Sequence, residues 1–235
     1  MWGRSNMLSE YVGKGALVGV DQTGNALLSE SAYAQLCSRL VRAEIMPGDK
    51  LVESALRADL GLGLSPVREA IRRLEFEKLV VIYPRSGTYA TEIALKDSRS
   101  VMELRLELES LATTLACSRG SKAEKEQLVA LAEEQAQTTD LQRCIDLDAA
   151  FHESIYRMSR NEYLVATARV YFNLALRQWY FCSKVVTTPD WTGVDHRSMA
   201  AAVAAEDAAT ATEQMREHVR HDSQQVFEIL TNYGL

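Results

Sequence analysis

The stretch GLSPVREAIRRLEFEKLV, residues 63–80, decides how the first third of the chain folds. Ser65 followed by Pro66 predicts a helix start, because serine caps the free N–H groups of a first turn and proline loses no hydrogen bond there. Arg68 and Arg72 lie four residues apart and therefore share one side of this helix. Apolar residues at helical spacing form its buried stripe: Val67, Ala70, Ile71 and Leu74.

The segments around this helix complete a recurring order of elements. Apolar periodicity predicts helices over 28–43 and 54–60, and the turn at 46–51 leads into a short extended piece. After the third helix, β-branched residues around Pro-Arg-Ser-Gly predict a β-hairpin over 79–93. Three short helices and a hairpin are the order of a winged helix-turn-helix, whose third helix enters the DNA major groove.

The arginines of this unit are candidates for DNA contact. A single arginine on a helix is most often part of a solvated face. A solvated face is therefore the alternative to DNA contact for Arg68 and Arg72. Arg68 and Arg72, however, occupy the N-terminal half of the recognition helix, where guanine and phosphate acceptors are met. Arg85 and Gly87 fall at the hairpin tip, where a cation and a close backbone approach suit a wing on phosphates.

The net charge of −6 argues weakly against a nucleic-acid binder, so its distribution matters. Residues 1–43 hold 4 basic and 3 acidic side chains, and residues 44–92 hold 7 and 8. Residues 93–235 hold 15 and 21. The acidic excess therefore belongs to the last part of the chain, and the first part can present a basic surface if its charges are segregated in space.

The composition is that of an ordinary globular protein, with 47% hydrophobic and 25% charged residues. No apolar run approaches the ~20 residues that a membrane span needs. The first 30 residues lack the pattern of a signal peptide. Four cysteines stand far apart without a C-x-x-C pair, so we expect reduced, buried thiols in a cytoplasmic protein: Cys37, Cys117, Cys144 and Cys182.

From Asp97 onward the whole chain has helical periodicity, which predicts an all-α bundle over 97–235. It follows a winged helix-turn-helix domain over 29–93, and the small residues of 1–28 are expected to form a flexible arm. The fold class is thus mainly α. Predicted helices of the bundle cover 97–118, 121–138, 141–159, 161–184, 193–205 and 207–231.

All four histidines lie in the predicted bundle. At 100° per residue, Asp148 and His152 fall within the buried stripe of their helix, where a carboxylate is costly unless it is paired or binds metal. His196 shares a face with apolar residues, and His218 edges the inner face of the last helix. His221 points further toward water, as a solvent-facing or outer residue.

Three imidazoles and one carboxylate form a ligand set for a divalent transition metal. Zn²⁺ is the first candidate, with Ni²⁺, Mn²⁺ or Fe²⁺ as alternatives. Each residue taken singly is equally a satisfied polar group of the core, and Asp148 with His152 a simple ion pair. Their number on inward faces favours a metal site: Asp148, His152, His196 and His218.

The stretch LGLGLSPVREAIRRLEFEKLVVIYPRSGTYA, residues 60–90, closely resembles the DNA-binding domain of the GntR family of bacterial transcription regulators. The resemblance implies that Arg68 and Arg72 contact double-stranded operator DNA, with Ser65 and the wing at Gly87 assisting. It implies a DNA-binding regulator, most simply a repressor, in a bacterial cytoplasm.

Gly63-Leu64 departs from the family pattern, which has Ser-Arg before this helix and commonly uses the arginine to contact DNA. Leucine cannot make that contact, so the usual operator sequence is in question while DNA binding as such is not. A thymine methyl group is an apolar partner that Leu64 can reach.

The bundle resembles the FCD branch of the same family, named for the C-terminal domain of the fatty-acid regulator. The matching stretches are MELRLELESLATTLA (102–116), DLDAAFHESIY (146–156), DHRSMAAAV (195–203) and MREHVRHDSQQV (215–226). The resemblance implies a homodimer whose bundles hold the metal in an effector pocket. The effector is a small metabolite, often a carboxylate, that completes the metal coordination.

Three further residues are candidates for effector contact. Arg105 comes first, because the branch often carries an arginine here that faces the pocket and can clamp a carboxylate. Its alternative is an ion pair with Glu109, four residues on. Asn173 and Arg177 are weaker candidates, with an exposed helix face as their alternative.

Two other classes of protein compete with a regulator. A metal-dependent enzyme built on the bundle is the main alternative, since an open coordination position resembles a catalytic site. The sequence has no H-E-x-x-H motif and no evident general base to support it. An adaptor that uses the bundle alone leaves the arginine helix and the wing without a role.

Overall fold

The computed structural model describes residues 24–186 and 195–234, and most of the predicted arm 1–28 lies outside them. The chain divides into two units, residues 1–93 and 94–235, each with its own core. Helix α2 (Gly24–Val41) begins four residues before the predicted start at residue 28. A first helical turn needs no apolar stripe, so the apolar pattern begins later than the helix.

The first unit is built on α2, α3 (Glu53–Leu60) and α4 (Leu64–Phe76). Its α3 ends at Gly61, whose φ of +65° is the left-handed conformation that glycine adopts without strain. The apolar faces of the three helices and the adjoining strands meet in one core. Its members include Ala32, Leu36, Leu40, Leu56, Val67, Ile71, Leu74, Leu79 and Val80.

Helix α4 begins at Leu64, two residues before the predicted first residue Pro66, so the assignment of Ser65 as its cap is wrong. Gly63 is the cap residue, in extended conformation, and Leu64 is the first helical residue. Ser65 and Pro66 are therefore the second and third residues of the helix. None of the first N–H groups has an acceptor inside the helix, so proline is tolerated throughout this turn and does not mark its first residue.

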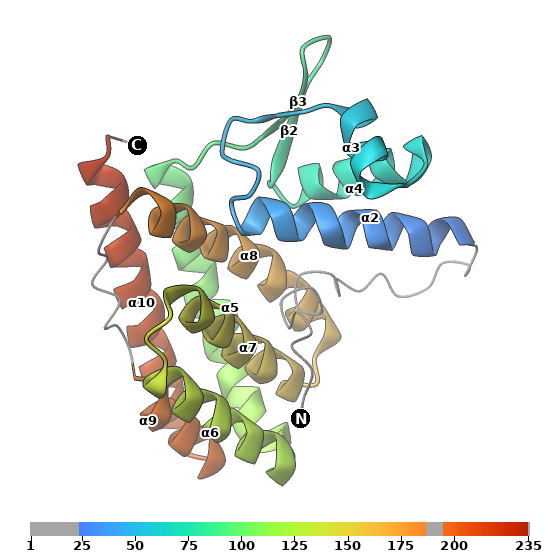
Figure 1. The fold of residues 1–235 in the computed structure, drawn as a ribbon. Helices are drawn as coiled ribbons and strands as arrows, with labels where there is room; N and C mark the ends of the chain where they lie inside the picture. Colours follow the sequence, from blue (N-terminus) through green and yellow to red (C-terminus); the bar gives the residue numbers. More distant parts are fainter. Residues whose placement is uncertain (1–23, 187–194, 235) are drawn as a thin grey trace. The chain divides into compact units, whose positions relative to one another are not determined.

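A three-stranded antiparallel sheet completes the unit, with strand order β1-β3-β2. Strands β2 (Val80–Tyr83) and β3 (Gly87–Ala90) form the predicted hairpin, which projects from the helices in Figure 1. Arg85 at its tip has a φ of +66°, and Gly87 has a φ of +127°. Strand β1 (Lys50–Leu51) pairs with β3 and lies at the end of the predicted turn 46–51, so the extended piece begins earlier than predicted.

The second unit is an all-helical bundle in which α5 and α10 run side by side (Figure 1). Predicted and observed helix bounds agree to within three residues, so the mainly α fold class is confirmed. Within residues 24–186 and 195–234, no helix is long and apolar enough to span a bilayer. The helices are α5 (Leu95–Arg119), α6 (Lys122–Gln137), α7 (Leu141–Met158), α8 (Glu162–Val185), α9 (His196–Ala204) and α10 (Ala208–Asn232).

Polar caps set the beginnings of these helices. Ser121 and Glu124 form a reciprocal capping box at α6, in which each side chain bonds to the other residue's backbone N–H. Asp140 caps α7, and Asp195 caps α9 by accepting a hydrogen bond from the backbone N–H of Arg197. The cap at Asp195 places His196 at the very first position of α9.

Candidate metal centre and nucleic-acid interface

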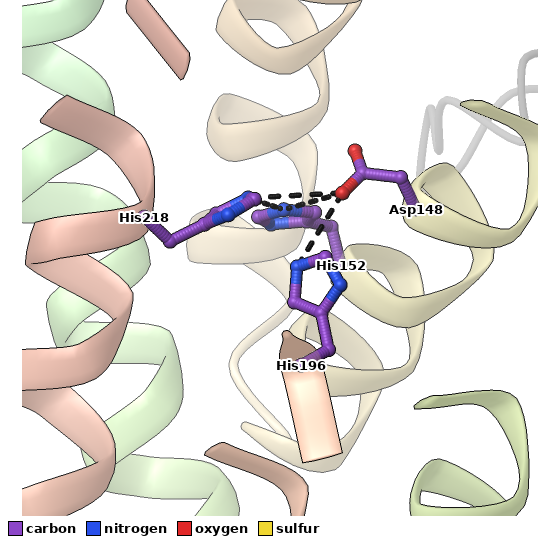
Figure 2. A group of neighbouring side chains, drawn as sticks. All are labelled: Asp148, His152, His196 and His218. Atoms are coloured by element: carbon purple, nitrogen blue, oxygen red, sulfur yellow. Dashed lines mark hydrogen bonds and ion pairs between the residues drawn. The ribbon is translucent and has the colours of Figure 1, made fainter. Parts of the chain in front are cut away.

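The structure brings the four predicted metal ligands together inside the bundle. Asp148 and His152 lie one turn apart on α7, His196 comes from the start of α9, and His218 from α10. Figure 2 shows the three imidazoles around one carboxylate oxygen of Asp148. One ligand atom from each residue lies within 4.8 Å of all the others, and the three histidines are buried.

The spacing of these atoms fits a metal ion. Metal–ligand bonds of about 2.0–2.2 Å place neighbouring ligand atoms about 3.0–3.5 Å apart. The Nε2 atoms of His152 and His218 are 3.0 Å apart, and Asp148 Oδ1 lies 3.4 Å from His196 Nε2 and 3.7 Å from His218 Nε2. His196 Nε2 is buried and makes no hydrogen bond with any described residue. A buried nitrogen left in this way is costly, and a metal ion would satisfy it.

The opposite nitrogens of two imidazoles are held by polar side chains from other helices. His196 Nδ1 donates to Gln135 Oε1 on α6, and His152 Nδ1 lies 2.6 Å from Glu109 Oε2 on α5. Partners of this kind orient a ligating imidazole and keep its Nε2 lone pair directed at the metal. These partners leave the Nε2 atoms of His152 and His196 facing the cluster.

Burial favours the neutral form of His196 and His218, which is the form that binds metal. Burial lowers the pKa of His196 to about 4, although the carboxylate of Asp148 opposes the shift. Burial also lowers the pKa of His218 well below its ordinary value, and the neighbouring His196 and His152 add to the effect.

A buried ion pair stands behind His152. Arg105 Nε donates to Glu109 Oε1 at 2.5 Å, and both side chains are almost completely inaccessible. Burial by itself raises the pKa of Glu109, but Arg105 and His152 more than offset it and hold that pKa at about 2. The Arg105 guanidinium also lies over the ring of Phe172, 5.1 Å from its centroid. The cluster is thus supported by a fixed negative charge and its positive partner.

The predicted DNA-contacting side chains lie on the surface of the first unit. Ser65, Arg68 and Arg72 are exposed on α4, and Arg85 is exposed at the hairpin tip. Arg68 Nε donates to Glu53 Oε2 on α3 at 2.8 Å, a solvent-exposed pair that leaves the arginine able to exchange partners. At Gly87 the φ of +127° is strained for any residue with a Cβ, and an added Cβ would meet the end of the Lys50 side chain at 3.0 Å.

The inward side of α4 is fixed to α2 by a polar network. Arg73 donates through Nη1 to Glu30 at 2.8 Å and through Nε to Glu77 at 3.2 Å. The Tyr33 hydroxyl donates to Glu77 at 2.7 Å, and the Arg73 guanidinium stacks 3.4 Å from the Tyr33 ring centroid. Since these contacts hold one side of α4 rigidly, its arginine-bearing side is presented in a fixed orientation.

Comparison with known proteins assigns both units. The model of bacterial regulatory proteins of the gntR family matches residues 28–90, and the FCD domain model matches residues 100–221. The FCD match alone spans more than half of the chain's 235 residues. The chain belongs to the GntR family of bacterial regulators, in its FCD branch.

Individual relatives agree with this assignment. The HTH-type transcriptional repressor GlaR of Escherichia coli K12 is 26% identical over 209 residues, covering 82% of this chain and 93% of the relative. The Nta operon transcriptional regulator of Aminobacter aminovorans is 31% identical over 125 residues, covering 52% of this chain and 60% of the relative. These relatives are regulators, so the GntR-family chain is a DNA-binding transcription regulator and not an enzyme.

Two solved structures share the fold. Escherichia coli McbR/YncC is 21% identical, with a TM-score of 0.74, covering 88% of this chain and 98% of that one. A GntR-type regulator from Rhodococcus sp. RHA1 is 18% identical, with a TM-score of 0.69, covering 85% and 97%. The winged helix-turn-helix followed by a helical C-terminal domain is therefore the architecture of this GntR-family regulator.

The structure places the remaining predicted residues of the GntR-family regulator as follows. Arg105 is buried and makes the ion pair with Glu109 that was its alternative. Asn173 and Arg177 are buried on α8, so the alternative of an exposed helix face is wrong for both. His221 is exposed and contacts Gln225 on its own helix.

Sequence reasoning missed four polar residues of these two sites. Glu109 contacts His152 and Gln135 contacts His196, in each case from another helix. Residue spacing within one helix cannot indicate such long-range pairs. Lys50 Nζ lies 5.6 Å from the ring centroid of Tyr89 on β3, which adds a cation beside the wing. Asp222 follows His218 by one turn and lies 3.2 Å from its Nε2. The i, i+4 spacing of His218 and Asp222 was the one signal that could have found it.

Proposed function

We propose that this GntR-family chain is a ligand-responsive repressor whose FCD bundle, residues 97–235, holds one divalent transition metal and whose domain 29–93 binds operator DNA. The ligands are Asp148, His152, His196 and His218, with Zn²⁺ first and Ni²⁺, Mn²⁺ or Fe²⁺ as alternatives. The observation that carries the proposal is the convergence of three buried Nε2 atoms and one carboxylate oxygen. The repressor assignment is supported by the relative GlaR, which is named a repressor.

The charge of this cluster supports a carboxylate as effector. The charges of Arg105 and Glu109 cancel within their pair, and Asp148 offsets one charge of a divalent ion. The one positive charge that these four ligands leave on the ion favours a further carboxylate at the metal, from the protein or from an effector. A guanidinium carries five N–H donors, and the hydrogen bond from Arg105 to Glu109 uses the donor on Nε. Arg105 therefore remains a candidate for contact with an effector carboxylate. Asn173 and Arg177, buried on α8, stay secondary candidates.

A leucine stripe on α5 supports a homodimer. Its members follow helical spacing, and Leu104 and Leu111 are 42% and 47% exposed. An outward apolar stripe on a helix is typical of a surface that packs against another helix. A two-fold dimer reads two half-sites related by inversion, so the operator is expected to be an imperfect palindrome. The stripe consists of Leu104, Leu108, Leu111 and Leu115.

Arg68→Ala should weaken specific operator binding by roughly 1–3 kcal/mol and relax the preference at one position of each half-site, because an arginine on the recognition helix reads a base. The Arg68 side chain is exposed and its ion pair with Glu53 is open to solvent, so the fold should be little affected. The measurement is a gel-shift titration of the natural operator and of single-base variants at fixed salt.

Arg85→Ala is the matched variant, because an arginine on the wing contacts phosphates and not bases. It should weaken binding to operator and unrelated DNA by the same factor, and reduce the salt dependence of binding by about one unit of slope. If folded Arg68→Ala protein binds every sequence as the parent protein does, the assignment of α4 as the recognition helix is wrong.

The proposed function as a whole is tested by capturing genomic DNA fragments with the full-length protein, with and without a metal chelator. We expect particular fragments, enriched reproducibly, and a change in their recovery when the chelator removes the metal. A screen of simple carboxylates on the metal-loaded protein then identifies the effector by its shift of the melting temperature. Random recovery of fragments contradicts the operator. Recovery that the chelator does not change, together with a melting temperature that no carboxylate shifts, contradicts the sensor.

A further inference from the structure

Asp222 is a buried carboxylate beside the metal cluster that the four-ligand set does not use. It lies on α10 one turn after His218 and is 8% exposed. Its Oδ2 is 3.2 Å from His218 Nε2. A carboxylate is costly to bury unless it is paired or coordinates a metal, so its place at the cluster requires a partner.

The nitrogen that Asp222 contacts distinguishes it from the supporting residues. Gln135 and Glu109 meet the Nδ1 atoms of His196 and His152, on the side away from the cluster. Asp222 meets the Nε2 atom of His218. This is the same atom that lies 3.0 Å from His152 Nε2 and 3.7 Å from Asp148 Oδ1. A residue that only orients an imidazole contacts its other nitrogen, so Asp222 stands on the ligand side.

The surroundings of Asp222 also suit the carboxylate of a small molecule. His218 Nε2 lies 3.2 Å from Asp222 Oδ2 and 3.7 Å from Asp148 Oδ1, so carboxylates from two helices meet at one imidazole nitrogen. An effector carboxylate that binds the metal on the α10 side of the cluster would have to displace Asp222.

We propose that Asp222 is a fifth protein ligand, which holds the metal position that an effector carboxylate must take. The inference rests on the proposed metal centre and deepens it. Binding of effector is then an exchange of one carboxylate for another at the same position, and not the filling of an open one. Because Asp222 and His218 share α10, the exchange releases one of the two contacts by which this helix holds the metal. Effector binding therefore changes how α10 is held, which is the kind of difference through which a ligand shifts a conformational equilibrium.

The test uses full-length protein loaded with Co²⁺, whose visible absorption reports the number and geometry of its ligands. Asp222→Asn removes the ligating oxygen charge at constant size, and Asp222→Ser serves as a second variant. Glu217→Gln is the matched control, because it removes a carboxylate from the exposed face of the same helix, next to His218. Folding of each protein is checked by its circular dichroism melt without metal.

Acetate and imidazole are the two probes, one anionic and one neutral. If Asp222 holds the position in about nine molecules of ten, its loss should tighten the binding of both probes about tenfold. The Co²⁺ spectrum before addition of a probe should change in Asp222→Asn and Asp222→Ser and remain that of the parent protein in Glu217→Gln. Co²⁺ affinity itself should fall about tenfold or more in the Asp222 variants.

The alternatives give distinct results. If acetate alone binds more tightly, with the spectrum and imidazole affinity unchanged, Asp222 acts only through its charge and the inference is overturned. An Asp222→Asn protein identical to Glu217→Gln in all three readouts overturns it as well. A parent protein that binds no Co²⁺ overturns the metal centre itself, and with it this inference, so the two failures are told apart.

Discussion

His152→Ala should reduce the metal content of the purified protein from about one ion per chain to a small fraction, because this imidazole is central to the cluster. Loss of a partner outside the ligand set already costs about 10–100-fold in metal affinity, so loss of a ligand should cost at least about 100-fold. His218→Ala should behave in the same way. The measurement is elemental analysis of untagged protein after metal loading and gel filtration, together with the shift of the melting temperature by a carboxylate.

His221→Ala is the control for this experiment, since His221 lies on the same helix as His218 but is exposed. It should retain the metal and the carboxylate-induced stabilisation. Equal metal content in all three variants, or none in the parent protein after loading, would refute the centre. The bundle would then have to sense its ligand through arginines and apolar contacts alone.

Glu109→Ala should lower the free energy of unfolding of the metal-free bundle by about 3–5 kcal/mol, the cost of leaving a buried charge without its partner. The uncompensated charge is that of Arg105, which is 3% exposed and lies 2.5 Å from the carboxylate. Urea denaturation followed by circular dichroism measures the change, with the transitions of the two units analysed separately.

A double variant separates this electrostatic cost from lost packing. Arg105→Met with Glu109→Leu replaces the pair by apolar side chains of similar volume, and should recover most of the stability that Glu109→Ala loses. Glu126→Ala, in the exposed pair of Lys122 and Glu126, should have no measurable effect. A Glu109→Ala protein as stable as the parent would mean that Arg105 reaches solvent or another partner after the change.

Much of the fold could be predicted because its signals are local. Apolar periodicity located the bundle helices, and the β-branched runs around Pro-Arg-Ser-Gly located the hairpin. The start of α4 was misplaced by two residues because every position of a first turn tolerates proline. The pairing of β1 with β3 joins residues about forty apart in sequence. The sequence could therefore indicate a short extended segment, but not the strand with which it pairs.

The candidate metal set was visible for a related reason. Polar residues that interrupt an apolar stripe are conspicuous in sequence, and Asp148 and His152 interrupt the same one. The residues that support them follow no such rule. Glu109 was read only as a partner of Arg105, and its contact with His152 depends on how α5 packs against α7. Similarly, Asn173 and Arg177 could not be recognised as buried until the packing of α8 was known.

The division between Ile93 and Ala94 has a consequence for how such regulators diversify. The DNA-reading unit and the sensing unit each complete their own apolar core, and residues 91–94 between them belong to no helix or strand. Recombination at this joint would therefore disrupt neither core, and a chimera carrying a foreign bundle should keep a folded reader. A new chemical signal could then be attached to an existing set of genes by exchange of one segment, without any change to the operators themselves.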